Sequence, residues 1–295
     1  MNNHNTKIEK YQGKIPRRKK FKYSKILQCG KVIDAVYMTW EPKAYVKRLK
    51  GREYVNLKTG EVREYMPKQD GVQMRNRRSL RKIFVDLRQL ITTNYEGGQS
   101  EKFLTLTYRE QTNDPKKIYK DLDIFNKRLK RAYPAIAYIH IVEPHASGNY
   151  HVHSLLKLTD GEAFDMTYDK AYKLWGQGFV KVENLIDVDN IGAYFVAYFS
   201  NMEITDSDVE KYPDDIIEKN GKKYIKGKRL DYYPDHMQIH RDSRNLKKPR
   251  KIEEIPKTHN KTYEVKYKLT YTDEYGNTEE SYLEKEQWKK ADRGV

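Results

Sequence analysis

One stretch of the sequence decides the fold: Tyr138-Ile139-His140-Ile141-Val142-Glu143-Pro144-His145-Ala146-Ser147-Gly148-Asn149-Tyr150-His151-Val152-His153-Ser154-Leu155-Leu156. The runs 136–143 and 151–158 are both strand-like, and the segment between them is rich in residues typical of turns. The stretch therefore predicts a β-hairpin.

This hairpin would assemble a metal site. Alternate side chains of a strand share a face, so His151 and His153 point the same way, and Glu143 arrives close to His151 at the turn end. Two imidazoles and one carboxylate leave open positions on an ion. Such a set suits Mg²⁺ or Mn²⁺ holding a phosphate, and Zn²⁺ is chemically possible. The alternative for so short a motif is that both histidines only hydrogen-bond to solvent and neighbours.

The segments around the hairpin alternate between strand and helix patterns. The expected order is strand 102–108, helix 115–132, strand 136–143, strand 151–158, helix 165–175, strand 178–183 and helix 188–201. Asp114 is a typical helix cap before Pro115, and Gly176 and Gly178 end the second helix. Two βαβ-like halves joined by a hairpin predict an α+β fold with a ferredoxin-like or RRM-like antiparallel sheet. Helices would cover one face, and the metal ligands would lie on the open face.

Two further histidines of the stretch are expected to be bystanders. His140 has the opposite strand parity to Glu143 and so faces the helices or an edge. His145 lies in the turn and would reach the ion only through a bend of the loop.

Composition and pattern divide the chain into five segments. They are a basic flexible arm (1–30), a strand-and-helix appendage (31–100), the nuclease-like core (101–205), a basic DNA-binding extension (206–260), and a C-terminal hairpin with a tail (261–295). The appendage contains a predicted hairpin that turns at Thr59-Gly60. It also contains a helix at 75–94 whose apolar face is formed by Leu80, Phe84, Leu87, Leu90 and Ile91. The C-terminal hairpin has no functional interpretation.

The charge favours a polyanionic partner. Fifty-eight Lys and Arg against 42 Asp and Glu give a formal charge of +16. Basic clusters at 14–25, 75–82 and 241–251 make nucleic acid the best interpretation, although each alone is equally a solvated surface. Some of the 25 tyrosines can stack unpaired bases, while most are expected to be half-buried strand residues.

The remaining composition concerns the cellular setting. The single Cys29 fits a reducing cytoplasm, and no apolar run approaches membrane-spanning length. The N-terminal residues lack the apolar core of a secretory signal. We therefore expect a soluble cytoplasmic protein with no membrane contact. No Gly-x-x-x-x-Gly-Lys-Ser/Thr loop occurs, so unwinding would come from a separate helicase.

Three segments in order resemble the motifs of HUH-type rolling-circle replication initiators, the Rep proteins of small phages, plasmids and integrative elements. They are Phe103-Leu104-Thr105-Leu106-Thr107-Tyr108, His151-Val152-His153, and Tyr194-Phe195-Val196-Ala197-Tyr198. With its flanks at 77–81 and 226–249, the resemblance covers roughly residues 60–250. It implies an HUH endonuclease domain that acts on single-stranded origin DNA.

The resemblance also implies the reaction. A tyrosine attacks a phosphate, keeps a 5′-phosphotyrosine link and releases a 3′-OH that a host polymerase extends. Tyr198 ranks slightly ahead of Tyr194 because Asn201 stands three residues later, where the family commonly has lysine. Alternatively, one of the pair packs the helix on the sheet, or both act in turn. The cations expected to contact DNA are Arg77, Arg78, Arg81, Lys228, Arg229, Arg244, Lys247 and Lys248.

Three other functions remain open. An HUH relaxase usually has its tyrosine before the histidines, and a single-tyrosine transposase is usually close to a bare catalytic domain; neither fits this order with large flanks. A non-catalytic basic DNA-binding protein would use the histidines structurally. A homo-oligomer is compatible with each of these functions.

Overall fold

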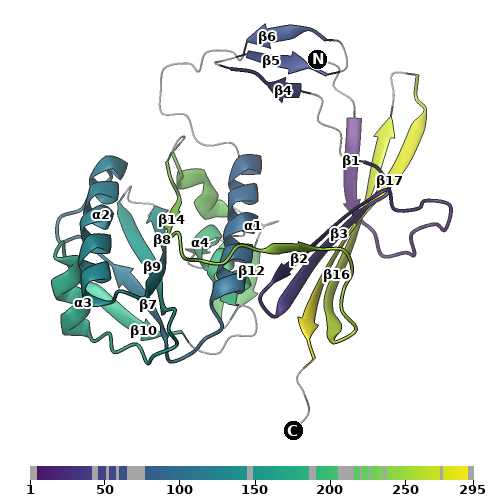
Figure 1. Cartoon of the computed structure of the whole chain (residues 1–295). Coiled ribbons are helices and arrows are strands. Elements are labelled where there is room, and N and C mark those ends of the chain that lie inside the picture. The colour runs from purple at the N-terminus through teal and green to yellow at the C-terminus, as the bar shows by residue number, and fades with distance from the viewer. Residues whose placement is uncertain are drawn as a thin grey trace. The chain divides into compact units, whose positions relative to one another are not determined.

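The computed structural model describes residues 5–41, 46–50, 53–57, 60–64, 77–144, 149–185, 191–204, 216–219, 221–225, 227–234, 237–272 and 275–291. It divides into two compact units (Figure 1). Unit 1 comprises Met1–Gly71 and Arg250–Val295, and unit 2 comprises Val72–Pro249.

Unit 2 is built on a five-stranded sheet in which every neighbouring pair is antiparallel, with the order β10-β7-β9-β8-β14. Its elements are β7 (Glu101–Leu106), α2 (Pro115–Ala132), β8 (Ile136–Pro144), β9 (Tyr150–Leu158), α3 (Tyr168–Trp175), β10 (Val180–Asn184) and β14 (His240–Asp242). Without β14, the chain order β-α-β-β-α-β and this strand order define a ferredoxin-like sheet. The predicted α+β fold class and the central hairpin are confirmed.

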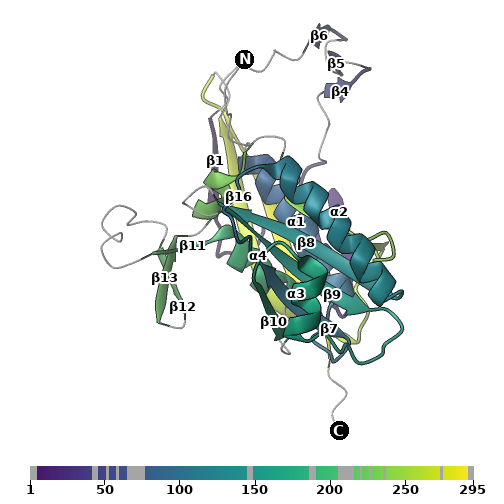
Figure 2. The same cartoon turned by 90° about the vertical axis from the view of Figure 1, so that its left-hand side faces the viewer.

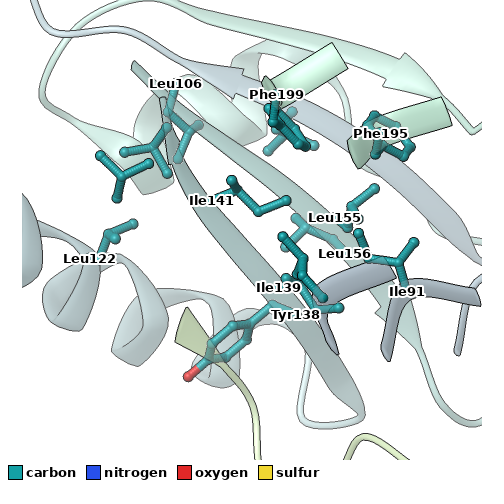
Figure 3. Packing of buried hydrophobic residues seen from close by; sticks show 14 of the residues in the cluster. Ile91, Leu106, Leu122, Tyr138, Ile139, Ile141, Leu155, Leu156, Phe195 and Phe199 are labelled. Atoms are coloured by element: carbon teal, nitrogen blue, oxygen red, sulfur yellow. The ribbon is translucent and has the colours of Figure 1, made fainter. Parts of the chain in front are cut away.

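Helices cover both faces of this sheet, whereas the sequence predicts one open face. α2 and α3 lie across one face (Figure 2), and α1 (Arg77–Asn94) and α4 (Ile191–Ser200) lie on the other (Figure 1). Figure 3 shows Ile91, Phe195 and Phe199 on the side of the sheet opposite Leu122. The predicted apolar stripe of α1 is buried on this second face. Because that stripe needs a partner, the face that carries the candidate ligands is not an open surface.

The local signals at the helix ends act as the sequence predicts. The Asp114 carboxylate accepts a hydrogen bond of 2.9 Å from the backbone N–H of Lys116, and Pro115 is the first residue of α2. Gly176 adopts the left-handed conformation (φ 71°) directly after α3. These caps fix where each helix returns to the sheet.

A second small sheet in unit 2 lies within the predicted basic extension. It has the order β11-β13-β12, with β11 (Met202–Ile204), β12 (Ile216–Lys219) and β13 (Lys222–Ile225). The short 3₁₀ helix η2 (Lys228–Tyr232) follows, and it contacts α4 and α1. The chain thus returns from this sheet to the face of the core that α4 covers.

Unit 1 contains a six-stranded sheet with the order β1-β16-β17-β3-β2-β15. Its strands are β1 (Asn5–Lys10), β2 (Tyr23–Cys29), β3 (Val32–Met38), β15 (Arg250–Ile252), β16 (His259–Thr272) and β17 (Thr278–Lys290). The predicted C-terminal hairpin is confirmed by the pairing of β16 with β17. Residues 1–30, expected to be a flexible arm, instead contain β1 and β2. Only Ile26 and Cys29 of β2 are buried, so exposed polar residues hide its strand pattern in the sequence.

A three-stranded sheet completes unit 1, with the order β4-β5-β6. Its strands are β4 (Val46–Arg48), β5 (Glu53–Asn56) and β6 (Val62–Glu64). The pairing of β5 with β6 confirms the predicted hairpin, and Gly60 has the positive φ of 76° that such a turn favours. No helix among the described residues is both long and apolar enough to cross a membrane.

The close crossing of α1 and α4 gives a testable prediction. A Cβ atom at Gly192 would lie 2.2 Å from Thr92 Oγ1 and 2.5 Å from the carbonyl oxygen of Arg88. Gly192→Ala should therefore push α4 away from α1 and lower the free energy of unfolding by about 1–3 kcal/mol in urea titrations. Gly98→Ala is the matched control, because a Cβ at Gly98 meets no atom within 4 Å. Equal stability of the two variants would contradict this packing.

Candidate active site

The register of the sheet brings the predicted ligands onto one face. Glu143 lies directly opposite His151 in the pairing of β8 with β9, and His153 lies opposite Ile141. Residues directly opposite each other in an antiparallel pair point to the same side. On the other flank of β9, Thr105 of β7 lies opposite His153. The predicted common face of His151, His153 and Glu143 follows from this register.

His153 and Glu143 form the buried centre of the site. His153 Nε2 contacts a carboxylate oxygen of Glu143, and His153 Nδ1 lies 3.2 Å from Thr105 Oγ1. A hydroxyl both donates and accepts, so Thr105 can serve either tautomer of the ring and hold Nε2 toward the carboxylate. Burial lowers the pKa of His153 to about 3. The imidazole is therefore neutral near pH 7, which is the form that binds metal ions.

Aromatic rings fix the orientation of His153. Phe103 stacks parallel to the imidazole with ring centres 5.5 Å apart, and Phe199 of α4 lies 5.1 Å from it. Phe195, one turn earlier on α4, packs on Phe103 at 4.7 Å. The phenylalanines of α4 thus form the contact between this helix and the site.

The three predicted ligands agree with a divalent ion in chemistry and in face, and they are loosely gathered. His151 is half-buried on the same face as the two buried residues. Among the described residues, one group of His, Cys, Asp or Glu side chains has three ligand atoms within 4.8 Å of one another, and it is Glu264, Glu284 and Glu286 of unit 1. The latter group is bridged by Lys261 and Lys266.

Arg229 is a site residue that the sequence reading assigned to DNA. Its guanidinium contacts the second carboxylate oxygen of Glu143, and its side chain is 18% exposed. It lies on η2, which begins where the backbone N–H of Gly227 donates to Asn201 Oδ1 at 3.0 Å. Asn201, expected to donate to a phosphate, thus accepts a bond that ties the end of α4 to η2. No local pattern links residue 229 to residue 143, so the sequence did not reveal this pair.

Tyr194 stands on α4 beside the packed phenylalanines and is 43% exposed. The packing role that the sequence allowed for one tyrosine belongs to Phe195 and Phe199. Position 198 lies one turn further along α4, and the side chain of Tyr198 is outside the described part of the structure. By contrast, burial raises the pKa of Tyr108 and Tyr233, which makes those phenols harder to ionise.

His140 has the structural role that the sequence predicts. It is fully buried on the opposite face, where Nδ1 lies 2.8 Å from Ser154 Oγ and Nε2 lies 2.7 Å from Asn126 Oδ1 of α2. Burial lowers its pKa to about 3. His145 is outside the described residues.

The other predicted DNA contacts differ in how they are held. Arg81, Arg244 and Lys247 are exposed. Lys228 pairs with Asp231 at 3.1 Å, and Lys248 pairs with Asp242 at 3.0 Å. The side chains of Arg77 and Arg78 are outside the described part.

Comparison with known proteins agrees with this site. A family model of replication-associated proteins of the ORF2 type matches residues 101–203, which is less than half of the 295-residue chain. The matched segment runs from β7 into β11 and contains Glu143, both histidines and α4. The core is of the replication-initiator type. No curated protein and no solved structure matches the chain.

The buried His140 predicts how stability changes with pH. Its pKa in the folded protein lies below the ordinary value of 6.5, so the unfolded chain binds the proton first as the pH falls. The contribution is complete above pH 6.5 and is lost between pH 6.5 and about 3, by at most about 1.4 kcal/mol per pH unit. His140→Gln should flatten this dependence in urea titrations between pH 7.5 and 5. Parallel slopes for the variant and the wild type would contradict the assignment.

Proposed function

We propose that this chain nicks and rejoins single-stranded DNA at a replication origin through a tyrosine of α4 and so initiates rolling-circle replication. The observation that carries the proposal is the meeting of Glu143 and neutral His153 on one sheet face beside α4, with His151 on the same face. All of these lie within the segment that matches the replication-associated family.

Glu143, His151 and His153 would hold a divalent ion, with Mg²⁺ or Mn²⁺ as the best candidates. A bound ion supplies polarisation of the scissile phosphate and stabilises its developing charge. Arg229 now neutralises Glu143. When this carboxylate serves a cation, the guanidinium is repelled from it and becomes available to the DNA phosphate.

The chemistry needs a phenol that reaches the phosphate. The oxygen of Tyr194 or Tyr198 attacks phosphorus, the bond from phosphorus to the 3′ oxygen breaks, and the phenolic proton ends on that oxygen. The products are a 5′-phosphotyrosine and a free 3′-OH, which attacks the phosphotyrosine in the reverse step that rejoins the strand. The exposed Tyr194 meets the requirement for access. A separate helicase and a host polymerase would supply unwinding and synthesis.

The nucleophile can be tested through the covalent product. Wild-type protein incubated with Mn²⁺ and single-stranded origin DNA should form an adduct that survives a denaturing gel. Tyr194→Phe and Tyr198→Phe tested singly rank the two tyrosines, and the double variant should form no adduct. Tyr168→Phe is the matched control, because this tyrosine of α3 is similarly exposed at 49%. An adduct from the double variant, or none from the wild type, would refute the mechanism.

The metal ligands can be tested by binding as well as by cleavage. His151→Ala should abolish adduct formation and the rise in Tm that Mn²⁺ gives the wild type, while salt-sensitive DNA binding is largely kept. His153→Ala should act in the same way, with circular dichroism to confirm folding because this side chain is buried. His240→Ala, in β14, is the control that should retain both responses. Unchanged cleavage by His151→Ala would sink the metal assignment.

A further inference from the structure

An exposed aromatic side chain continues the row of candidate ligands across the sheet. Glu143 lies opposite His151, and extending the register of β9 with β7 by one residue places Thr107 opposite His151. The backbone N–H of Thr107 donates to the carbonyl oxygen of Phe179 at 2.8 Å, so the ladder of β7 with β10 also extends by one residue. Phe179 therefore follows Glu143, His151 and Thr107 in one row.

Strand parity puts Phe179 on the same face as the ligands. Val180 and Leu106 are paired and buried on the opposite face, which packs against α2 and α3. Residues on either side of them point to the ligand face. Two strand spacings separate Phe179 from His151, so the two backbones are roughly 10 Å apart.

This end of the face combines an uncovered ring with positive charge. Phe179 is 63% exposed, although Phe195 and Phe199 of α4 are buried on the same face of the sheet. Lys181, two residues further along the same face, has a side chain that is 70% exposed and pairs with Glu183 at 2.9 Å. Arg109 is exposed beyond Thr107 and donates to the Tyr172 hydroxyl at 3.2 Å. An exposed ring flanked by cations has the chemistry that binds unpaired nucleotides.

We propose that Phe179 stacks on a base of the single-stranded DNA next to the nucleotide whose phosphate lies at His151, with Lys181 contacting the adjoining backbone. This inference rests on the proposed function, because it places the same DNA strand across the sheet. Every base has a π-face, so Phe179 adds affinity and position without reading sequence. Phe179 is a positioning residue, because it touches the DNA away from the reacting atoms.

The experiment measures binding of a fluorescent oligo-dT strand in EDTA by anisotropy, so that no cleavage is required. Phe179→Ala should raise Kd by roughly 5- to 150-fold, and Phe179→Trp should restore it. The slope of log Kd against log salt should stay unchanged for Phe179→Ala and should fall by about 0.7 for Lys181→Ala, which removes one phosphate contact. Tyr168→Ala is the matched control, because it removes an exposed ring from α3, which packs on the opposite face, and should bind as the wild type does.

Wild-type affinity of Phe179→Ala, or an equal loss in Tyr168→Ala, would overturn the inference. As a direct readout, a strand carrying 5-iodouracil should photocrosslink to the peptide that contains Phe179, and a crosslink elsewhere alone would also overturn it. The covalent-adduct assay is independent of both measurements. If wild type forms no adduct while Phe179→Ala still loses affinity, the nicking mechanism fails and the stacking site stands.

Discussion

The architecture of unit 2 depends on one buried carboxylate. Glu143 is 3% exposed, and an ionised carboxylate in such a position is costly unless it is paired. Its partners come from two other segments: His153 on β9 and Arg229 on η2. The hairpin register, the Thr105 hydroxyl and the bond from Gly227 to Asn201 all serve to deliver these partners. The same demand for a counter-charge explains why an arginine stands where a catalytic cation would also be welcome, and why the site stays ordered without an open sheet face.

Two helical layers around the sheet set where chemistry can happen. Apolar contacts fix both faces, so the middle of the sheet is closed to solvent. Exposure then rises along the ligand face, from the buried His153 to the half-buried His151 and the exposed Phe179. A rigid buried ligand next to a more accessible one is a suitable arrangement for an ion that must also hold a large substrate. The DNA strand would therefore lie over the end of the sheet at which the paired strands β8 and β9 reach their turn.

Much of the core follows from local patterns. Alternation in 136–158, the cap at Asp114 and the glycine at 176 fix the hairpin and the helix ends, so sequence reading recovers the strand order and the shared face of Glu143 and the histidines. Long-range pairings escape it. Neither the contact of Arg229 with Glu143 nor the pairing of β1 with β16 leaves a local signal. The second layer of helices was missed for the same reason, since an amphipathic helix states that it needs a partner without naming which sheet face supplies it.

The geometry of α4 explains why the order of the two tyrosines matters less than their stripe. Residues four apart on a helix lie on one side, so positions 194 and 198 form a stripe next to the one formed by positions 195 and 199. The phenylalanine stripe is anchored on Phe103 and His153. This anchoring fixes the rotation of the helix about its axis, and the adjacent stripe is thereby fixed as well. A helix turned by one residue would bury position 194 and move a phenylalanine toward solvent, so the packing that orients His153 also sets the side from which a phenol on this stripe can approach the phosphate.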